Sequence, residues 1–219
     1  MTTTTSDGSL SNKLRLITDL ERPDHWHLDE HDECYFFGDY TPRAGYSHSD
    51  ANQLILNLKK PPHFRNHPAW RHKLRAINKC GIVLAANLNH ALAASSAIVP
   101  IPPSKPPDHD DFDDRMIKVA EKAAPFRAAN ALITETARDP LHSSDQKRDV
   151  DAIYQGIGLR LEALGDANTV FLLDDVLTTG ASFRACCRRL EDAEQITRII
   201  GVFIARCARP KVEFPALDF

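Results

Sequence analysis

The sequence predicts an α/β fold in which helices cover both faces of a doubly wound, mostly parallel sheet. Four short apolar segments favour strands and alternate with segments of helical spacing, at about 97–101, 130–134, 169–174 and 197–205. The run from Thr169 to Leu173 has no polar alternation, which is typical of a strand buried on both faces of a parallel sheet. Because ligands bind at the carboxyl ends of such strands, the loops that follow them form the candidate site.

Length and composition indicate a globular protein with one domain and an appendage. The chain has 219 residues, of which 42% are hydrophobic and 26% charged, as in ordinary soluble domains. No apolar run approaches the length of a membrane span and the first residues do not resemble a signal peptide, so we expect a cytoplasmic protein without membrane contact. The net charge of -3 gives no basic field for general nucleic-acid binding, although it leaves a local basic patch open.

The cysteines do not indicate a disulfide framework or a zinc ribbon, because they are five in number and show no C-x-x-C spacing. They are Cys34, Cys80, Cys186, Cys187 and Cys207. Cys186 and Cys187 fall within a predicted helix, where we expect small apolar helix residues rather than redox chemistry.

The chain divides into four predicted regions: a disordered start (1–12), an N-terminal hood or appendage (13–65), the core (66–206) and a C-terminal tail (207–219). The hood is rich in His, Asp and Glu, and His27 and His31 have a spacing that would place both on one helical face beside Glu30. These side chains could bind a metal, or they could belong to a solvated loop; both alternatives stay open.

Within these regions the sequence predicts a strand-like aromatic segment at 35–40 and several helices. Ser49 and Asp50 are predicted to cap a helix that buries Leu54, Ile55 and Leu58. Further helices are expected at about 68–94, where the internal Gly81 allows for two helices, and at 113–124, 150–164 and 182–191.

The segment 169–182 carries the strongest chemical signal. Asp174 and Asp175 stand where the predicted strand leaves the core, and a loop rich in hydroxyl groups then opens a helix. The loop consists of Thr178, Thr179, Gly180, Ala181 and Ser182. A glycine permits the tight turn, and hydroxyls and unpaired amides at a helix start suit a phosphate.

This segment resembles the 5-phosphoribosyl-1-pyrophosphate (PRPP) motif of type I phosphoribosyltransferases. The resemblance implies that Asp174 and Asp175 accept hydrogen bonds from the ribose 2′- and 3′-hydroxyls, and that 178–182 wraps the 5′-phosphate. The alternative is a structural one, in which the same residues simply cap a βα turn.

A second predicted loop follows the strand at 97–101 and reads Pro100-Ile-Pro-Pro-Ser104-Lys105. It resembles the pyrophosphate-binding loop of the ComF-like branch of these enzymes, which singles out Ser104 and Lys105. The ComF-like pattern is broken in the acidic run from Asp108 to Asp114. This run could bind magnesium or a substrate amine, or it could be the solvated start of a helix.

The region 135–148 has no apolar period and is expected to be a mobile, cationic loop that orders on PRPP binding. A flexible loop at a comparable place closes over PRPP in type I enzymes, and this resemblance assigns Arg138 and Arg148, with Lys105, to the catalytic group. Thr136 matches the ComF-like pattern in kind, whereas His142 stands where a glutamine is expected. An ordinary solvated connection is the alternative.

Together these features predict transfer of a phosphoribosyl group between PRPP, or a ribose 5-phosphate nucleotide, and a nitrogen acceptor. Pyrophosphate would be the co-product, and Mg²⁺ is expected to enter through PRPP rather than through assigned protein ligands. The competing class is a non-catalytic PRPP or nucleotide sensor, or a ComF-like accessory of DNA processing. No motif in 20–65 indicates the acceptor base or amine, and nothing in the sequence indicates the oligomeric state.

Overall fold

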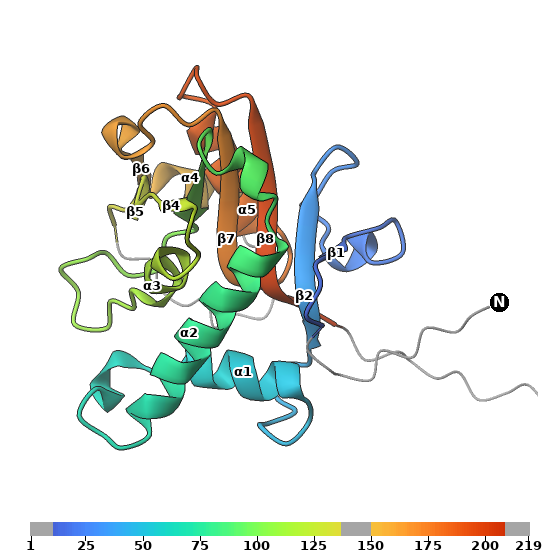
Figure 1. The fold of residues 1–219 in the computed structure, drawn as a ribbon, viewed down its shortest axis with the longest axis vertical. Coiled ribbons are helices and arrows are strands. Elements are labelled where there is room, and N and C mark those ends of the chain that lie inside the picture. The colour runs from blue at the N-terminus through green and yellow to red at the C-terminus, as the bar shows by residue number, and fades with distance from the viewer. Residues whose placement is uncertain (1–10, 137–149, 209–219) are drawn as a thin grey trace, which may run out of the picture.

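A computed structural model describes residues 11–136 and 150–208 (Figure 1). Its strands are β1 (Arg15–Leu16), β2 (Cys34–Tyr40), β3 (Ser96–Pro100), β4 (Arg127–Ala128), β5 (Leu132–Thr134), β6 (Ile157–Leu159), β7 (Thr169–Leu177) and β8 (Arg198–Cys207). Its α-helices are α1 (Asp50–Leu58), α2 (Trp70–Asn87), α3 (Arg115–Glu121), α4 (Val150–Gln155) and α5 (Ala181–Leu190). Short 3₁₀ helices are η1 (Arg22–Asp24), η2 (Pro62–Phe64), η3 (His90–Leu92) and η4 (Leu161–Ala163).

Within the described residues, the main sheet has six strands in the order β1-β2-β8-β7-β3-β4. All neighbouring pairs are parallel except β1 and β2, which are antiparallel. Every residue of β3 is buried, as are Thr169 to Leu173 of β7, because the sheet is covered on both faces. The α/β class with a mostly parallel sheet is thereby confirmed.

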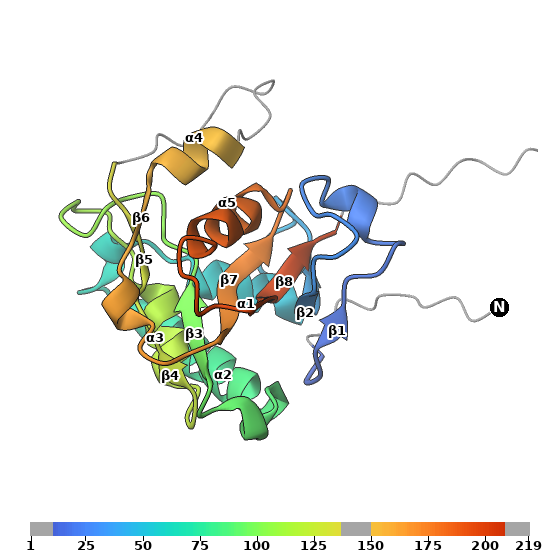
Figure 2. The same cartoon turned by 90° about the horizontal axis from the view of Figure 1, so that it is seen from above.

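The described helices pack on opposite faces of this sheet, as Figure 2 shows from above. One core layer holds the apolar side chains of α1, α2 and α3, and the other holds those of α4 and α5. Helices on both faces are compatible with the predicted doubly wound arrangement. Among the described residues, no helix combines the length and apolar character needed to cross a membrane.

The predicted local signals of the first two helices are confirmed. The side chain of Ser49 accepts a hydrogen bond from the amide of Asn52 and so caps α1, which buries Leu54, Ile55 and Leu58. Helix α2 continues through Gly81 without a break and ends at Asn87, earlier than expected. A side chain at Gly81 would collide with Cβ of Lys122, so this glycine lets α2 and α3 approach closely.

Two predictions were wrong. The segment 130–134 is not a strand of the main sheet: β5 pairs antiparallel with β6 in a separate sheet, and β4 pairs with β3 instead. The helix expected over 150–164 ends at Gln155, because Ile157–Leu159 forms the strand that pairs with β5. A backbone partner distant in the sequence has overridden the helical spacing of the apolar residues there.

The aromatic segment of the predicted hood belongs to the main sheet, since β2 pairs in parallel with β8 from Cys34↔Gly201 to Tyr40↔Cys207. The cysteines within the described residues form no disulfide, and Cys186 and Cys187 are buried in α5. Burial raises the pKa of the Cys187 thiol, which makes it a packing residue rather than a reactive one.

Candidate functional site

The two acids lie within β7, not after it as expected, because the strand continues to Leu177. Its pairing with β3 ends at Pro100↔Leu173, whereas its pairing with β8 continues to Leu177↔Arg206. Beyond Leu173 the edge of β7 therefore faces the loop that follows β3. The loop that follows β3 thus begins beside Asp174, at the carboxyl end of the sheet, whereas the loop 178–182 begins after Leu177.

Successive residues of a strand point to opposite faces, so Asp174 and Asp175 face different layers. Leu172, on the face of Asp174, packs in the α5 layer, and Leu173, on the face of Asp175, packs in the layer of α1, α2 and α3. The structure therefore brings the two acids to one edge of the sheet but separates their side chains.

The carboxylate of Asp175 is buried, with 5% of the side chain exposed, and it is already occupied by two cations. Its Oδ2 accepts hydrogen bonds from Nε and Nη2 of Arg115 at 2.9 and 2.6 Å. Its Oδ1 lies 3.0 Å from Nζ of Lys59, at the end of α1. Burial by itself would raise the pKa of Asp175, but Arg115 and Lys59 outweigh it and hold the pKa below the ordinary value.

The ion-pair network extends from Arg115 to Asp113 and Lys73. Asp113 Oδ2 lies 2.7 Å from Nη1 of Arg115 and 2.7 Å from Nζ of Lys73. Lys73 is buried and also donates to the carbonyls of Leu58 and Lys60 at 2.9 and 2.8 Å. Burial lowers the pKa of Lys73, against the opposing pull of Asp113. A buried cation thus closes the carboxyl end of α1.

The acidic run 108–114 therefore has a structural role at its end. Asp113 belongs to the network, and Asp114 pairs with Lys118 at 2.7 Å. Asp108, Asp110 and Asp111 are exposed to solvent. Among the described residues, no group of three His, Cys, Asp or Glu side chains could hold a metal ion, either here or around His27 and His31.

Asp174 is the acid of the pair that no described cation contacts. It is partly exposed, and its Oδ1 accepts a hydrogen bond from the amide of Asp175 at 2.7 Å. Burial, together with the neighbouring charge of Asp175, raises the pKa of Asp174 to about 7. A carboxyl group that titrates near neutral pH can accept or donate a hydrogen bond at a sugar hydroxyl.

The loop 178–182 has the backbone of an anion site. Gly180 has φ 87° and precedes Ala181, the first residue of α5, whose amide donates to the hydroxyl of Thr179 at 3.3 Å. A Cβ atom at Gly180 would lie 2.9 Å from Cδ2 of Leu28, so both the conformation and the space require glycine. The following first-turn amides, with the hydroxyls of Thr178, Thr179 and Ser182 beside them, can be offered to a phosphate.

The N-terminal segment 25–32 covers the carbonyl side of this loop, which the sequence did not indicate. A ring nitrogen of His25 contacts the carbonyl of Thr178, and the amide of His27 donates to the carbonyl of Thr179 at 3.0 Å. Arg184 of α5 binds Asp29 and Asp32 at 3.2 and 2.7 Å. These contacts hold the loop through its carbonyl groups and do not involve its amides.

The loop after β3 starts at Ile101, whose amide donates to the carbonyl of Leu173 at 2.9 Å. The hydroxyl of Thr134, at the end of β5, donates to the carbonyl of Pro103 at 2.5 Å and holds the loop. Ser104 is exposed and Lys105 is half-buried, and Lys105 forms no ion pair with a described residue. Arg138 and Arg148, with most of the expected cationic loop 135–148, lie outside the described residues.

Comparison with known proteins does not assign this chain to a family. No family model matches this sequence, and no curated protein is detectably similar to it.

Proposed function

We propose that the chain binds PRPP, or a ribose 5-phosphate nucleotide, at the carboxyl end of β7 and transfers the phosphoribosyl group to or from a nitrogen acceptor. The observation that supports this most is the left-handed turn at Gly180 that opens α5, on the same strand-loop-helix unit as Asp174. In such a ligand the 5′-phosphate is attached to the ribose. In the chain, the loop 178–182 that would hold the phosphate directly follows the strand that carries Asp174.

In this proposal each part of the loop has a separate task. The first-turn amides of α5 and the hydroxyls of Thr178, Thr179 and Ser182 hold the 5′-phosphate. Asp174 binds a ribose hydroxyl, because its carboxylate has no cationic partner among the described residues. Lys105 stabilises the departing pyrophosphate, because a cation there neutralises negative charge that grows on the leaving group in the transition state.

Asp175 has a different role from Asp174. Arg115 is rigidly enclosed between two acids, whereas Lys59 has 38% of its side chain exposed and can leave. The side chain of Asp175 lies on the opposite face of β7 from Asp174, so it positions Arg115 and Lys59 beside the loop rather than binding the same ribose. Magnesium would enter with the pyrophosphate, whose oxygens are the ligands it prefers.

A non-catalytic sensor of PRPP or of a nucleotide is the second candidate. The occupied carboxylate of Asp175 favours it, because an acid already paired with Arg115 and Lys59 contributes little to positioning a ribose for reaction.

Calorimetry with PRPP and Mg²⁺ tests the binding site. Asp174→Asn removes a charge-assisted hydrogen bond of about 1.5–3 kcal/mol, so we expect affinity to fall more than tenfold. Asp166→Asn, at an exposed acid before β7, is the matched control and should bind as the wild type does. Unchanged affinity in Asp174→Asn would contradict the proposed site.

Pyrophosphate release separates enzyme from sensor. Purines, pyrimidines and simple amines are offered with PRPP to the wild type and to Lys105→Ala. An enzyme should lose more turnover than PRPP affinity in this variant. If the wild type binds PRPP but releases no pyrophosphate with any acceptor of the panel, the sensor is favoured.

A further inference from the structure

The ion-pair network around Asp175 holds more cations than acids. The acids are Asp113 and Asp175, and the cations are Lys59, Lys73 and Arg115. Each cation lies 3.0 Å or less from a carboxylate oxygen. The side chains of Lys73, Asp175 and Asp113 are 1%, 5% and 10% exposed, so water screens the surplus positive charge poorly. One further negative charge would balance the network.

Lys73 is charged, so the surplus is not removed by a neutral lysine. Its amino group donates to the carbonyls of Leu58 and Lys60 and lies 2.7 Å from Oδ2 of Asp113. Three acceptors need three N–H bonds, which only the ammonium form of lysine provides. The two carbonyls satisfy donors of Lys73, but their partial charges do not balance a full positive charge.

Lys59 is the cation of the network that remains open to a ligand. Its ammonium group contacts Oδ1 of Asp175 at 3.0 Å, and 38% of its side chain is exposed. Two of its three N–H bonds are therefore available to a further acceptor. Arg115, by contrast, is 20% exposed and is bonded to an acid on either side.

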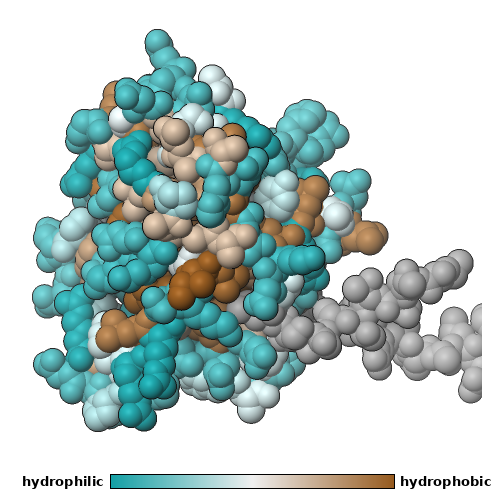
Figure 3. Space-filling view, viewed as in Figure 1, coloured by the Kyte–Doolittle hydropathy of each residue, from teal (hydrophilic) through white to brown (hydrophobic). Residues whose placement is uncertain are grey.

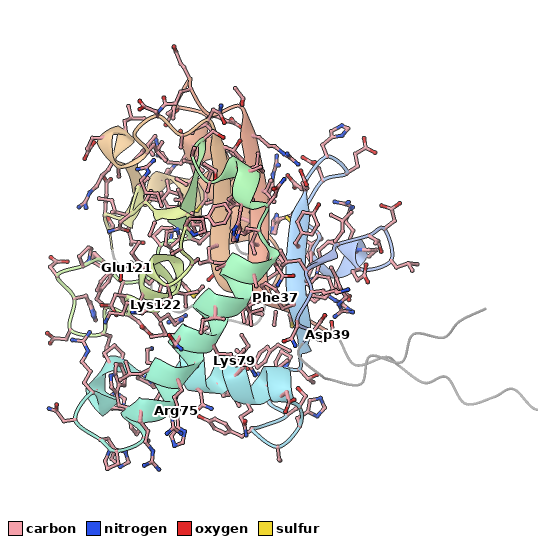
Figure 4. The ribbon with its side chains drawn as sticks, in the orientation of Figure 1. Phe37, Asp39, Arg75, Lys79, Glu121 and Lys122 are labelled. Carbon is pink, nitrogen blue, oxygen red and sulfur yellow. The ribbon has the colours of Figure 1, made fainter. Side chains whose placement is uncertain are left out.

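The part of the chain that surrounds this ammonium group is free of acids. The segment 51–107 forms α1, η2, α2, β3 and the loop after β3, and it contains no Asp or Glu. In Figure 4 the labelled acids Asp39 and Glu121 lie on β2 and α3, whereas Lys79 lies on α2. Figure 3 shows mainly hydrophilic surface over the lower part of the molecule, where α1 lies, so a charged group can approach from solvent.

The remaining acids near the network are placed elsewhere. Asp114 is paired with Lys118 at 2.7 Å, and Asp174 lies on the opposite face of β7 from Asp175. The balancing negative charge therefore has to be carried by a ligand.

The size of the surplus distinguishes between two kinds of anion. One carboxylate balances a single positive charge, and its two oxygens match the two available N–H bonds of Lys59. A phosphate group carries a charge of about -1.5 to -2 at neutral pH, which would place excess negative charge beside Asp175 and Asp113. The network is therefore better matched to a carboxylate.

Helix α1 places Lys59 at the edge of the sheet that holds the candidate site. The helix follows the loop after β2 and its end reaches Asp175, so it passes across the carboxyl ends of β2, β8 and β7, as Figure 1 shows. Asp174, at the neighbouring position of β7, would hold the ribose on the other face. A carboxylate at Lys59 would thus belong to a ligand bound next to the sugar.

We propose that Lys59 binds the carboxylate of a second ligand, and that the nitrogen acceptor of the proposed reaction is an acid rather than a neutral base. The surplus positive charge and the place of Lys59 at the carboxyl end of β7 carry this inference. Only the identification of the ligand as the acceptor rests on the proposed function, because the charge of the network is independent of it.

The carboxylate takes no part in the transfer itself. The acceptor nitrogen forms a bond to C1′ of the ribose, and the bond from C1′ to the pyrophosphate oxygen breaks with its electron pair. Any proton on the nitrogen is released to water. Lys59 holds the acceptor through the carboxylate while the nitrogen reacts.

Matched pairs of an acid and its amide test the preference for a charged ligand. Pyridine-3-carboxylate is compared with pyridine-3-carboxamide, and 2-aminobenzoate with 2-aminobenzamide. They are titrated by ligand-observed NMR at neutral pH and low salt, with and without PRPP and Mg²⁺. The members of each pair have similar shapes and differ by one charge, so we expect at least one acid to bind about tenfold tighter than its amide.

Substitutions at Lys59 and at its neighbour locate that preference. Lys59→Gln should reduce it to less than about threefold, whereas Lys59→Arg should keep most of it. Lys60→Gln is the matched control, because Nζ of Lys60 contacts the hydroxyl of Tyr46 at 3.3 Å and lies outside the network. The control retains the carbonyl that accepts from Lys73 and should bind as the wild type does.

Two competitors separate carboxylate from phosphate. Acetate should displace the bound acid from the wild type, and orthophosphate should displace it no more strongly than acetate does. PRPP calorimetry separates this inference from the proposed function. Lys59→Gln should keep PRPP affinity within about threefold of the wild type, because Lys59 lies across the strand from Asp174.

Three results would overturn the inference: no preference for the acid in either pair, equal losses in Lys59→Gln and Lys60→Gln, or Lys59-dependent displacement that is stronger with orthophosphate than with acetate. A wild type that binds no PRPP but keeps a Lys59-dependent preference for the acid would contradict the proposed function and support the carboxylate site.

Discussion

Asp174→Asn is expected to stabilise the folded protein at alkaline pH while it damages ligand binding. Burial and the charge of Asp175 raise the pKa of Asp174 from 3.8 to about 7, so the folded state resists ionisation of this carboxyl group. Asparagine cannot ionise, yet its Oδ1 can still accept the hydrogen bond from the amide of Asp175. A residue that costs stability and serves binding is typical of a functional site.

The magnitude follows from the change in pKa. A shift of about three pKa units at 1.36 kcal/mol per unit sets an upper limit of about 4 kcal/mol, and partial exposure of Asp174 lowers the expected gain to about 2–3 kcal/mol at pH 8. Because the folded pKa is raised, the cost appears as pH rises above about 4 and is complete above pH 7. The advantage of asparagine should therefore fall to less than half at pH 5.

Thermal and urea unfolding at pH 5 and pH 8 measure this difference. For a chain of this size, 2–3 kcal/mol corresponds to a rise in Tm of about 4–12 °C at pH 8. Asp166→Asn, at an exposed acid, should change stability little at either pH. A variant no more stable than the wild type at pH 8, or equally stabilised at both pH values, would refute the reasoning.

Two further substitutions test the network and the loop. Arg115→Ala leaves Asp175 and Asp113 buried with one cation each, so we expect a loss of about 3 kcal/mol in urea unfolding. Gly180→Ala forces a side chain against Leu28 in a left-handed conformation, so it should lower stability by about 1–3 kcal/mol and reduce PRPP affinity more than tenfold in calorimetry.

Each of these substitutions has a control within the chain. Arg198→Ala removes an exposed partner of Glu33 and should cost less than about 1 kcal/mol, so an equal loss would show that burial of Arg115 is unimportant. Gly45 has a similar φ of 80° but no atom within 4 Å of an added Cβ. Equal effects of Gly45→Ala and Gly180→Ala on PRPP binding would count against a role of the loop.

Sequence patterns were reliable where one short segment carries the signal. The apolar run of β7, the Ser49 cap of α1 and the position of Gly180 before α5 were all predicted from neighbouring residues. The helix expected over 150–164 failed because its spacing of apolar residues is also compatible with a strand, and β5 supplied the partner. Its outcome depended on a segment about 25 residues earlier in the chain.

By itself, the sequence determined the buried run of β7, the Ser49 cap of α1 and the position of the loop 178–182 before α5, since backbone propensity, capping and a left-handed glycine act within a few residues. Only the tertiary structure decided which charges meet. Arg115 reaches Asp175 across 60 positions and His25 reaches Thr178 across 153. Ion pairs depend on the approach of distant segments, which no local pattern specifies, and so the different roles of Asp174 and Asp175 emerged only in the fold.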